Sequence, residues 1–116
     1  MELSIKDRIY IPQMLPKQGK FTEFNLKRGI IGKVAITEKD RKDYSIEEDK
    51  EKGQIKWNVK KDIEMPLVVD LTKEELEYLR ASCELLVDAS YPDDFWFTVE
   101  KIYAVSYTHL TLPTIC

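Results

Sequence analysis

Acidic side chains come nearest to a catalytic or metal-binding pattern in this sequence. Four of them gather at one predicted helix start: Asp70, Glu74, Glu75 and Glu77. Carboxylates held close together can transfer protons or bind a cation. Carboxylates in the first turn of a helix are also stabilised by the helix dipole. We favour this structural role for Glu74 and Glu75.

The remaining acidic groups have similarly simple explanations. Asp93 and Asp94 stand at a second predicted helix start. Glu47, Glu48 and Asp49 lie in a charged stretch that lacks the glycine and the terminal glutamate of a calcium loop. We therefore expect no metal site and no cofactor.

Nucleophiles and soft metal ligands are scarce. The sequence has one histidine, His109, and two cysteines, Cys83 and Cys116. A zinc site needs about three or four such ligands at short spacing, and a Ser–His or Cys–His pair would depend on His109. We expect Cys83 to be buried as a small hydrophobic residue of a helix. Because no phosphate-binding glycine motif is present either, we expect the chain not to be an enzyme.

Three consecutive aromatic residues, Phe95, Trp96 and Phe97, are the candidate protein-binding site. One helix cannot bury three adjacent large rings on a single narrow face, so we expect one of them to face solvent or a partner. The alternative is that a part of the protein beyond this sequence covers the ring.

Charge is distributed unevenly along the chain. Residues 1–45 carry ten basic and six acidic side chains, a net charge of +4, whereas residues 46–104 carry a net charge of −7. The candidate nucleic-acid-binding residues are the basic ones of the first half: Lys17, Lys20, Lys27, Arg28 and Lys33. Phe21 and Phe24 lie among them and could stack on bases. We favour the alternative, in which the two halves attract each other and both phenylalanines are core residues.

The composition fits one domain of 116 residues with 43% hydrophobic and 34% charged side chains. No apolar run reaches the roughly 20 residues that a membrane span needs. The first residues also lack the basic and then apolar pattern of a secretory signal. We expect a cytoplasmic protein of unknown oligomeric state, without membrane contact.

Four helices are predicted, over residues 4–11, 21–34, 72–87 and 92–103. Ser4 and Thr72 are good N-caps, and Thr37 begins a further short turn. Pro12 and Pro16 should end the first helix, because proline lacks an amide proton and disfavours helix in the residue before it. Gly29 and Gly32 weaken the second helix by about 1 kcal/mol each.

A β-hairpin is predicted over residues 54–59 and 63–71. Ile55, Trp57 and Val59 alternate with polar residues, and the alternation resumes from Ile63 to Leu71. A period of two places these side chains on one face of a sheet. With helices to cover that face, the predicted fold is α+β with more helix than strand.

The last residues, 105–116, resemble a translated transposase adapter from a sequencing library. Every residue from Val105 to Thr114 matches one reading frame of that adapter. The alternative is a genuine C-terminal strand rich in threonine and leucine. We expect the domain to comprise residues 1–104, with a truncated reading frame after Ala104 and a non-native tail that contains both His109 and Cys116.

Short motifs over residues 4–87 resemble small uncharacterised proteins of bacteriophages and bacterial prophages. The motifs are Ile5-x-x-Arg8-Ile9, then Leu15-Pro16-Lys17-x-Gly19-x-Phe21, and later Ile55-x-Trp57 before a capped helix. The resemblance implies a bacterial or phage-infected cell and supplies no catalytic or binding residue. We expect a small interaction protein that binds another protein. The alternative is a nucleic-acid-binding protein that uses the basic first half.

Overall fold

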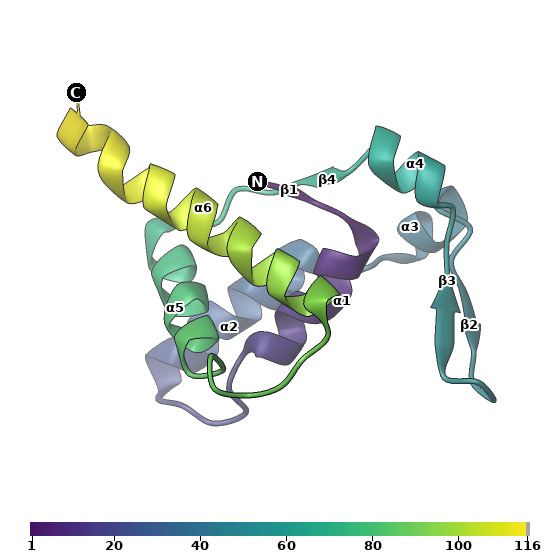
Figure 1. Cartoon of the computed structure of the whole chain (residues 1–116), viewed down its shortest axis with the longest axis horizontal. Helices are drawn as coiled ribbons and strands as arrows, with labels where there is room; N and C mark the ends of the chain where they lie inside the picture. The colour runs from purple at the N-terminus through teal and green to yellow at the C-terminus, as the bar shows by residue number, and fades with distance from the viewer. Residues whose placement is uncertain (116) are drawn as a thin grey trace.

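A body of four helices carries a smaller projecting arm (Figure 1). The computed structural model describes the backbone of residues 1–115 and the side chains of residues 1–105. The body consists of α1 (Ile5–Met14), α2 (Phe21–Val34), α5 (Lys73–Glu84) and α6 (Asp93–Ile115). The arm consists of α3 (Glu38–Asp43), β2 (Glu47–Asp49), β3 (Gln54–Lys56) and α4 (Val59–Glu64). The fold is α+β with more helix than strand, which confirms the predicted class.

The arm and the body are joined by a two-stranded antiparallel sheet, β1 (Glu2–Leu3) with β4 (Leu67–Val68). Next to this sheet the amino group of Met1 donates to the carbonyl oxygen of Val69 at 3.1 Å. The amide of Val69 in turn donates to the carbonyl of Met1 at 3.0 Å. The first residues of the chain are therefore built into the junction.

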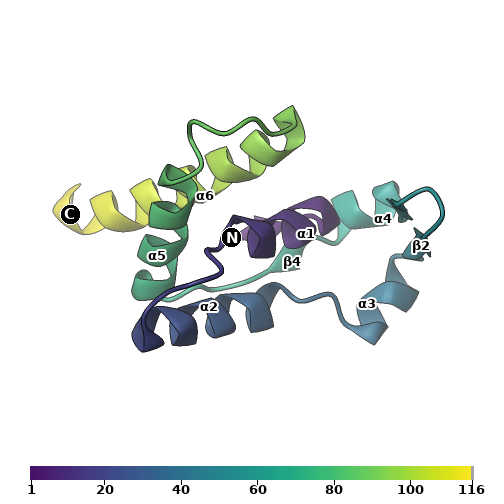
Figure 2. The same cartoon turned by 90° about the horizontal axis from the view of Figure 1, so that it is seen from below.

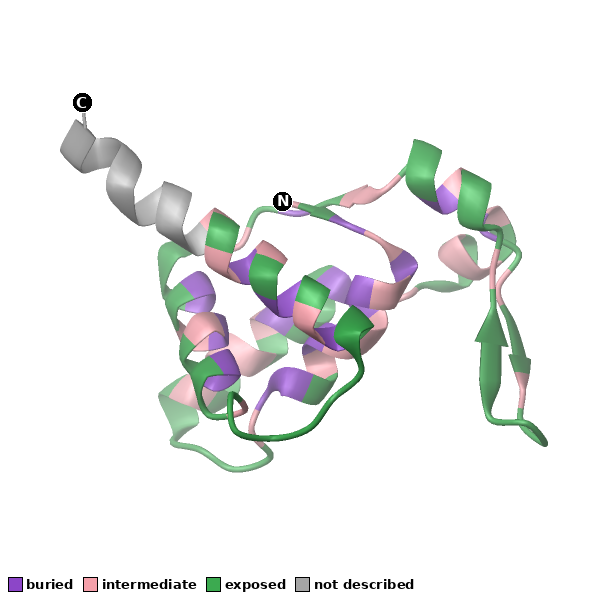
Figure 3. Cartoon of the chain, viewed as in Figure 1, coloured by how far each residue is buried: buried purple, intermediate pink, exposed green. Residues whose placement is uncertain are grey.

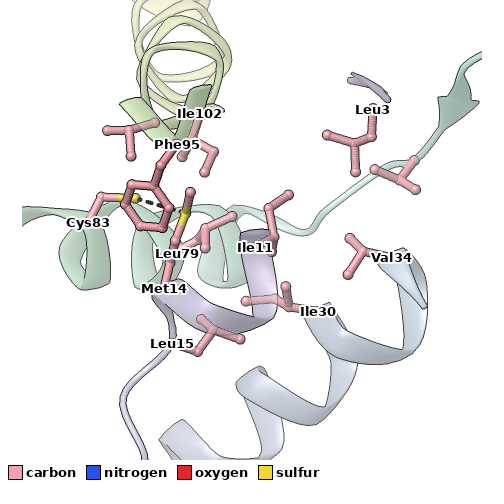
Figure 4. Close-up of a cluster of buried hydrophobic side chains, with 12 residues drawn as sticks. Leu3, Ile11, Met14, Leu15, Ile30, Val34, Leu79, Cys83, Phe95 and Ile102 are labelled. Carbon is pink, nitrogen blue, oxygen red and sulfur yellow. Dashed lines mark hydrogen bonds between the residues drawn. The ribbon is translucent and has the colours of Figure 1, made fainter. Parts of the chain in front are cut away.

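The core lies where the four body helices meet, with α1 packed against α2, α5 and α6 (Figures 1 and 2). Fully buried side chains come from all four helices, as Figure 4 shows: Ile11, Met14, Ile30, Val34, Leu79, Cys83, Phe95 and Ile102. Each large apolar side chain buried in this way contributes about 1.5–3 kcal/mol. Figure 3 shows that the strands of the arm are mostly exposed.

Three helices begin with the reciprocal N-terminal bonds that the sequence pattern favours. The pairs are Ser4 with Asp7, Thr37 with Asp40, and Thr72 with Glu75. In each pair the hydroxyl accepts from a backbone amide inside the helix, and the carboxylate accepts from the amide of the capping residue. The predicted bounds of α2, residues 21–34, are confirmed.

The helix predicted over residues 4–11 is longer, because α1 continues through Pro12 to Met14. Proline inside a helix costs about 3 kcal/mol. The extra turn is retained because it places Met14 in the core, and Leu15 is buried directly after it. Leu15 is extended, as expected of a residue before Pro16.

The prediction of a β-hairpin formed by residues 54–59 and 63–71 is wrong. β3 pairs with β2 in the charged segment before it, residues 59–64 form α4, and β4 pairs with β1 at the other end of the chain. Val59 and Ile63 are exposed, so the alternating residues do not share a buried face.

Two turn-forming residues explain the different pairing. The side chain of Asp49 accepts from the amides of Glu51 and Lys52 at 3.1 and 3.2 Å, and Gly53 adopts a positive φ of 62°. These residues close the β2–β3 turn. The side chain of Asn58 then accepts from the amide of Lys61 at 3.1 Å and starts α4.

The last two helices also differ from their predicted bounds. The helix predicted over residues 72–87 ends at Glu84, and both Leu85 and Val87 are exposed. The helix predicted over 92–103 runs on to Ile115, so the backbone of the tail is helical and not a strand. The side chains of His109 and Cys116 lie outside the described residues.

Arg8 of α1 is almost fully buried and holds the C-terminal end of α2. Its guanidinium donates to the carbonyl oxygens of Val34, at 3.0 Å, and Ala35. It also forms an ion pair with Asp40 at 2.7 Å. Burial would raise the pKa of Asp40, but the hydrogen bonds from Arg8 and Thr37 outweigh burial and hold that pKa below its ordinary value.

Asp7, the neighbour of Arg8, fastens α1 to α6. It is buried and accepts from the hydroxyl of Thr98 at 2.6 Å and from the ammonium group of Lys101. Burial would raise the pKa of Asp7. The bonds from Lys101, Thr98 and the Ser4 amide, together with the Lys101 charge, outweigh burial and lower the pKa.

Because its pKa is lowered by folding, ionised Asp7 stabilises the fold above the pKa of an unfolded aspartate, about 3.9. That contribution is lost as the pH falls through the lower pKa of the folded state. We predict that Asp7→Asn reduces the free energy of unfolding by about 1–3 kcal/mol at neutral pH. The deficit relative to the wild type should shrink below about pH 4. Urea unfolding across this pH range measures both effects.

The control for this experiment is Asp94→Asn. Asp94 forms an exposed ion pair with Lys6 at 2.6 Å, and exposed pairs contribute about 0–1 kcal/mol. A deficit for Asp7→Asn that stays constant down to acid pH would contradict the prediction.

Candidate interaction surfaces

The three consecutive aromatic residues of α6 separate, because neighbours on a helix point about 100° apart. Phe95 is 1% exposed and belongs to the core. Its ring stacks on Tyr91 with centroids 4.1 Å apart and meets Tyr10 edge to face at 5.4 Å. Phe95 is therefore not available to a partner in this fold.

Trp96 is half-buried beside Tyr91, with ring centroids 5.7 Å apart, and packs against the core. Phe97 is 64% exposed. This confirms the prediction that one of the three rings faces outward. The predicted cluster thus reduces to the exposed ring of Phe97 and the partly exposed ring of Trp96.

The candidate basic residues also divide into two groups. Lys27 donates to the carbonyl oxygen of Pro16 at 2.6 Å, and Lys33 pairs with Glu75 at 2.5 Å. Lys17, Lys20 and Arg28 are exposed. Within the side chains of residues 1–105, these three form no ion pair.

Glu75 has a structural role, as the helix-start interpretation predicts. It is buried, accepts from the amide of Thr72 at 2.9 Å and binds Lys33. Burial would raise the pKa of Glu75, but Lys33 and Thr72 together lower it. A Cβ atom on Gly29 would lie 2.3 Å from its carboxylate, so the missing side chain lets α2 approach α5. Within the described residues, no three acidic, histidine or cysteine side chains form a metal-binding group.

Phe21 and Phe24 do not lie in the core, contrary to the interpretation that we favoured. They are 76% and 45% exposed, and their rings stack with centroids 6.4 Å apart. The guanidinium of Arg28 lies over the Phe24 ring at 5.7 Å. Ile31, one helical turn further along, is exposed as well. We call Phe21, Phe24, Arg28 and Ile31 the α2 face.

Sequence reasoning missed Ile31 and the orientation of α2. The spacing of the α2 face, three residues, then four, then three, is visible in the sequence, but it is equally typical of a core stripe. A shallow hollow of about 500 Å³ lies beside this face, between α2 and the start of α5. It is lined by Thr22, Asn25, Leu26, Thr72, Glu74 and Glu75.

Cys83 is buried, as predicted, with its sulfur 3.8 Å from that of Met14. Burial, with a smaller contribution from Glu84, raises the pKa of the Cys83 thiol to about 11. The thiol is therefore protonated at neutral pH and is a poor nucleophile.

No protein-family model, curated protein or solved structure matches this chain. None of the helices in the described part of the chain has the length and apolar content of a membrane span.

The two phenylalanines of α6 should differ sharply in their effect on stability. We predict that Phe95→Ala lowers the free energy of unfolding by about 3–5 kcal/mol, because it opens a cavity in the core. Phe97→Ala should change it by about 0.5 kcal/mol or less. Chemical denaturation measures both, and Phe95→Leu provides a milder variant if Phe95→Ala does not fold. Equal losses at the two positions would contradict the burial pattern.

The two glycines of α2 give a matched pair of variants. Gly29→Ala forces its new methyl group against Glu75, so we predict a loss of about 1–3 kcal/mol in the free energy of unfolding. Gly32→Ala meets no atom within 4 Å and should gain up to about 1 kcal/mol from better helix propensity. Equal gains in urea unfolding would show that α2 and α5 are not in close contact at Gly29.

Proposed function

We propose that this chain is a non-enzymatic interaction protein that binds another protein through exposed apolar and aromatic side chains. The observation that carries this proposal is the stacked pair Phe21 and Phe24, which lies at the surface of a helix anchored in the core. Aromatic rings exposed side by side are enriched at protein interfaces and gain free energy when a partner excludes water from them.

The surface of α6 supports the same proposal less strongly. Phe97 is a single exposed ring, and single exposed apolar residues are common in proteins without a partner. Trp96 has only part of its ring available. In the proposed function the α2 face makes the main contact, and Trp96 with Phe97 forms a second, smaller one.

The proposed setting is the cytoplasm of a bacterial or phage-infected cell. It follows from the resemblance of residues 4–87 to phage and prophage proteins. Residues 1–104 contain no histidine, and their one cysteine, Cys83, carries a protonated, buried thiol. This composition supports a role in binding over a role in catalysis.

Nucleic-acid binding is the second candidate function, and one observation favours it. Lys17, Lys20 and Arg28 are exposed near two rings on which bases could stack. Against it, Lys27 and Lys33 are bonded within the fold, and the chain has a net charge of −3. An oligonucleotide titration tests it: no binding at low salt, or affinity that does not change with salt, excludes this function.

Selection from a displayed library of small protein domains tests the proposed function. We predict that binders selected on the wild-type protein lose at least about tenfold in affinity, or about 1.4 kcal/mol, for the double variant Phe21→Ser, Phe24→Ser. Leu85→Ser is the matched control, because Leu85 is 76% exposed and lies outside the α2 face. Binders that tolerate the double variant would place the surface elsewhere, and a selection without binders would contradict protein binding.

A further inference from the structure

We propose that the α2 face receives an acidic amphipathic helix from the partner protein. This inference rests on the proposed function, that the α2 face binds protein, and it adds the shape and the charge of the partner segment. Its evidence is the spacing of the exposed residues and the sign of the charges around them.

The spacing of the α2 face matches the seam of a helix–helix contact. Residues 21, 24, 28 and 31 follow the alternating steps of three and four that place side chains along one stripe of a helix. At 1.5 Å per residue, the stripe is about 15 Å long. A second helix is the secondary structure that fits such a stripe along its whole length, because its side chains enter the gaps between successive turns.

The stripe is held rigidly from behind. Ile30 and Val34, on another side of α2, are fully buried in the core. Arg8 fixes the last turn of α2 through the carbonyl of Val34. A partner that docks on the α2 face therefore meets a preformed surface and loses little free energy in ordering it.

The exposed charged side chains of α2 and of the turn before it have a single sign. Exposed charged side chains from Lys17 to Val34 are all basic: Lys17, Lys20 and Arg28, together with Lys33, which already pairs with Glu75. The one acidic residue in this range, Glu23, is half-buried and accepts from the amide of Lys20 at 3.0 Å. Carboxylates that flank the apolar residues of a partner helix would therefore be attracted, and lysines would be repelled.

The same charges disfavour two other occupants. Two copies of this chain that meet through their α2 faces would bring like charges together. A nucleic acid would meet few unpaired cations among the described side chains, because Lys27 and Lys33 are bonded within the fold. A nucleic acid also has no helical row of apolar side chains to pack on Ile31 at the end of the stripe.

Titration of the full-length protein with three synthetic helical peptides tests the inference. Each peptide has about three heptads with leucine at the a and d positions, and the e and g positions are all glutamate, all glutamine or all lysine. We expect the glutamate peptide to bind at least about tenfold more tightly than the glutamine peptide and the lysine peptide not to bind. Its affinity should fall as salt is added.

Variants locate the site of binding. Phe24→Ser should abolish binding of the glutamate peptide, and Arg28→Gln should weaken it severalfold while leaving the glutamine peptide unchanged. Leu85→Ser should leave both unchanged. Because all three positions are exposed, circular dichroism of each variant should match that of the wild type.

Each contrary outcome overturns a defined part of the argument. Equal binding of the glutamate and glutamine peptides, lost in Phe24→Ser, would refute the acidic partner and leave the proposed function standing. Peptide binding that survives Phe24→Ser would refute the α2 face as the site. Concentration-dependent dimers that are lost in Phe24→Ser would show that a second copy occupies the face. Binding of a single-stranded oligonucleotide, with no peptide bound, would refute both the inference and the proposed function.

Discussion

The buried guanidinium of Arg8 is the contact on which both parts of this protein depend. An isolated buried charge costs several kcal/mol, so it must be balanced within the fold. Here two carbonyl oxygens at the negative end of the α2 dipole and the carboxylate of Asp40 provide the balance. Because Asp40 is also part of the N-terminal cap of α3, the end of α2 and the start of the arm are fixed by one side chain.

The residue before Arg8 serves a different side of α1. Asp7 points toward α6, where Thr98 and Lys101 bind it. A helix surrounded by other helices cannot show a single apolar stripe, because each of its sides meets a neighbour. This explains why α1 carries adjacent buried charges of opposite sign, and why hydrophobic periodicity describes it poorly.

The parts of the fold that could be predicted from the sequence depend on local chemistry. The N-caps at Ser4 and Thr72 follow from residues within one turn of each other, and the bounds of α2 follow from the spacing of its apolar residues. The pairing of β4 with β1 could not be predicted, because more than sixty residues separate the two strands in the sequence: Glu2 pairs with Val68. Alternation over residues 54–71 favours strand, but the side chain of Asn58 caps a short helix, α4, within that stretch.

Local sequence patterns predict the candidate interaction surfaces only in part, as they do the fold. Helix geometry alone predicts that one of the three aromatic residues 95–97 faces outward, and the tertiary packing makes it Phe97. The exposure of Phe21 and Phe24 does not follow from such geometry, because a core stripe has the same spacing as the α2 face. The side of α2 that turns inward is set by a tertiary contact, the close approach of Glu75 to Gly29, which no local pattern contains.

The tie between Met1 and Val69 has a practical consequence for work on this protein. The free amino group of Met1 is itself a hydrogen-bond donor in the junction between body and arm. An affinity tag fused ahead of Met1 replaces that ammonium group with an uncharged amide and adds chain at the edge of the β1–β4 sheet. Stability and binding measured on an N-terminal fusion therefore describe a junction that differs from the one in this structure.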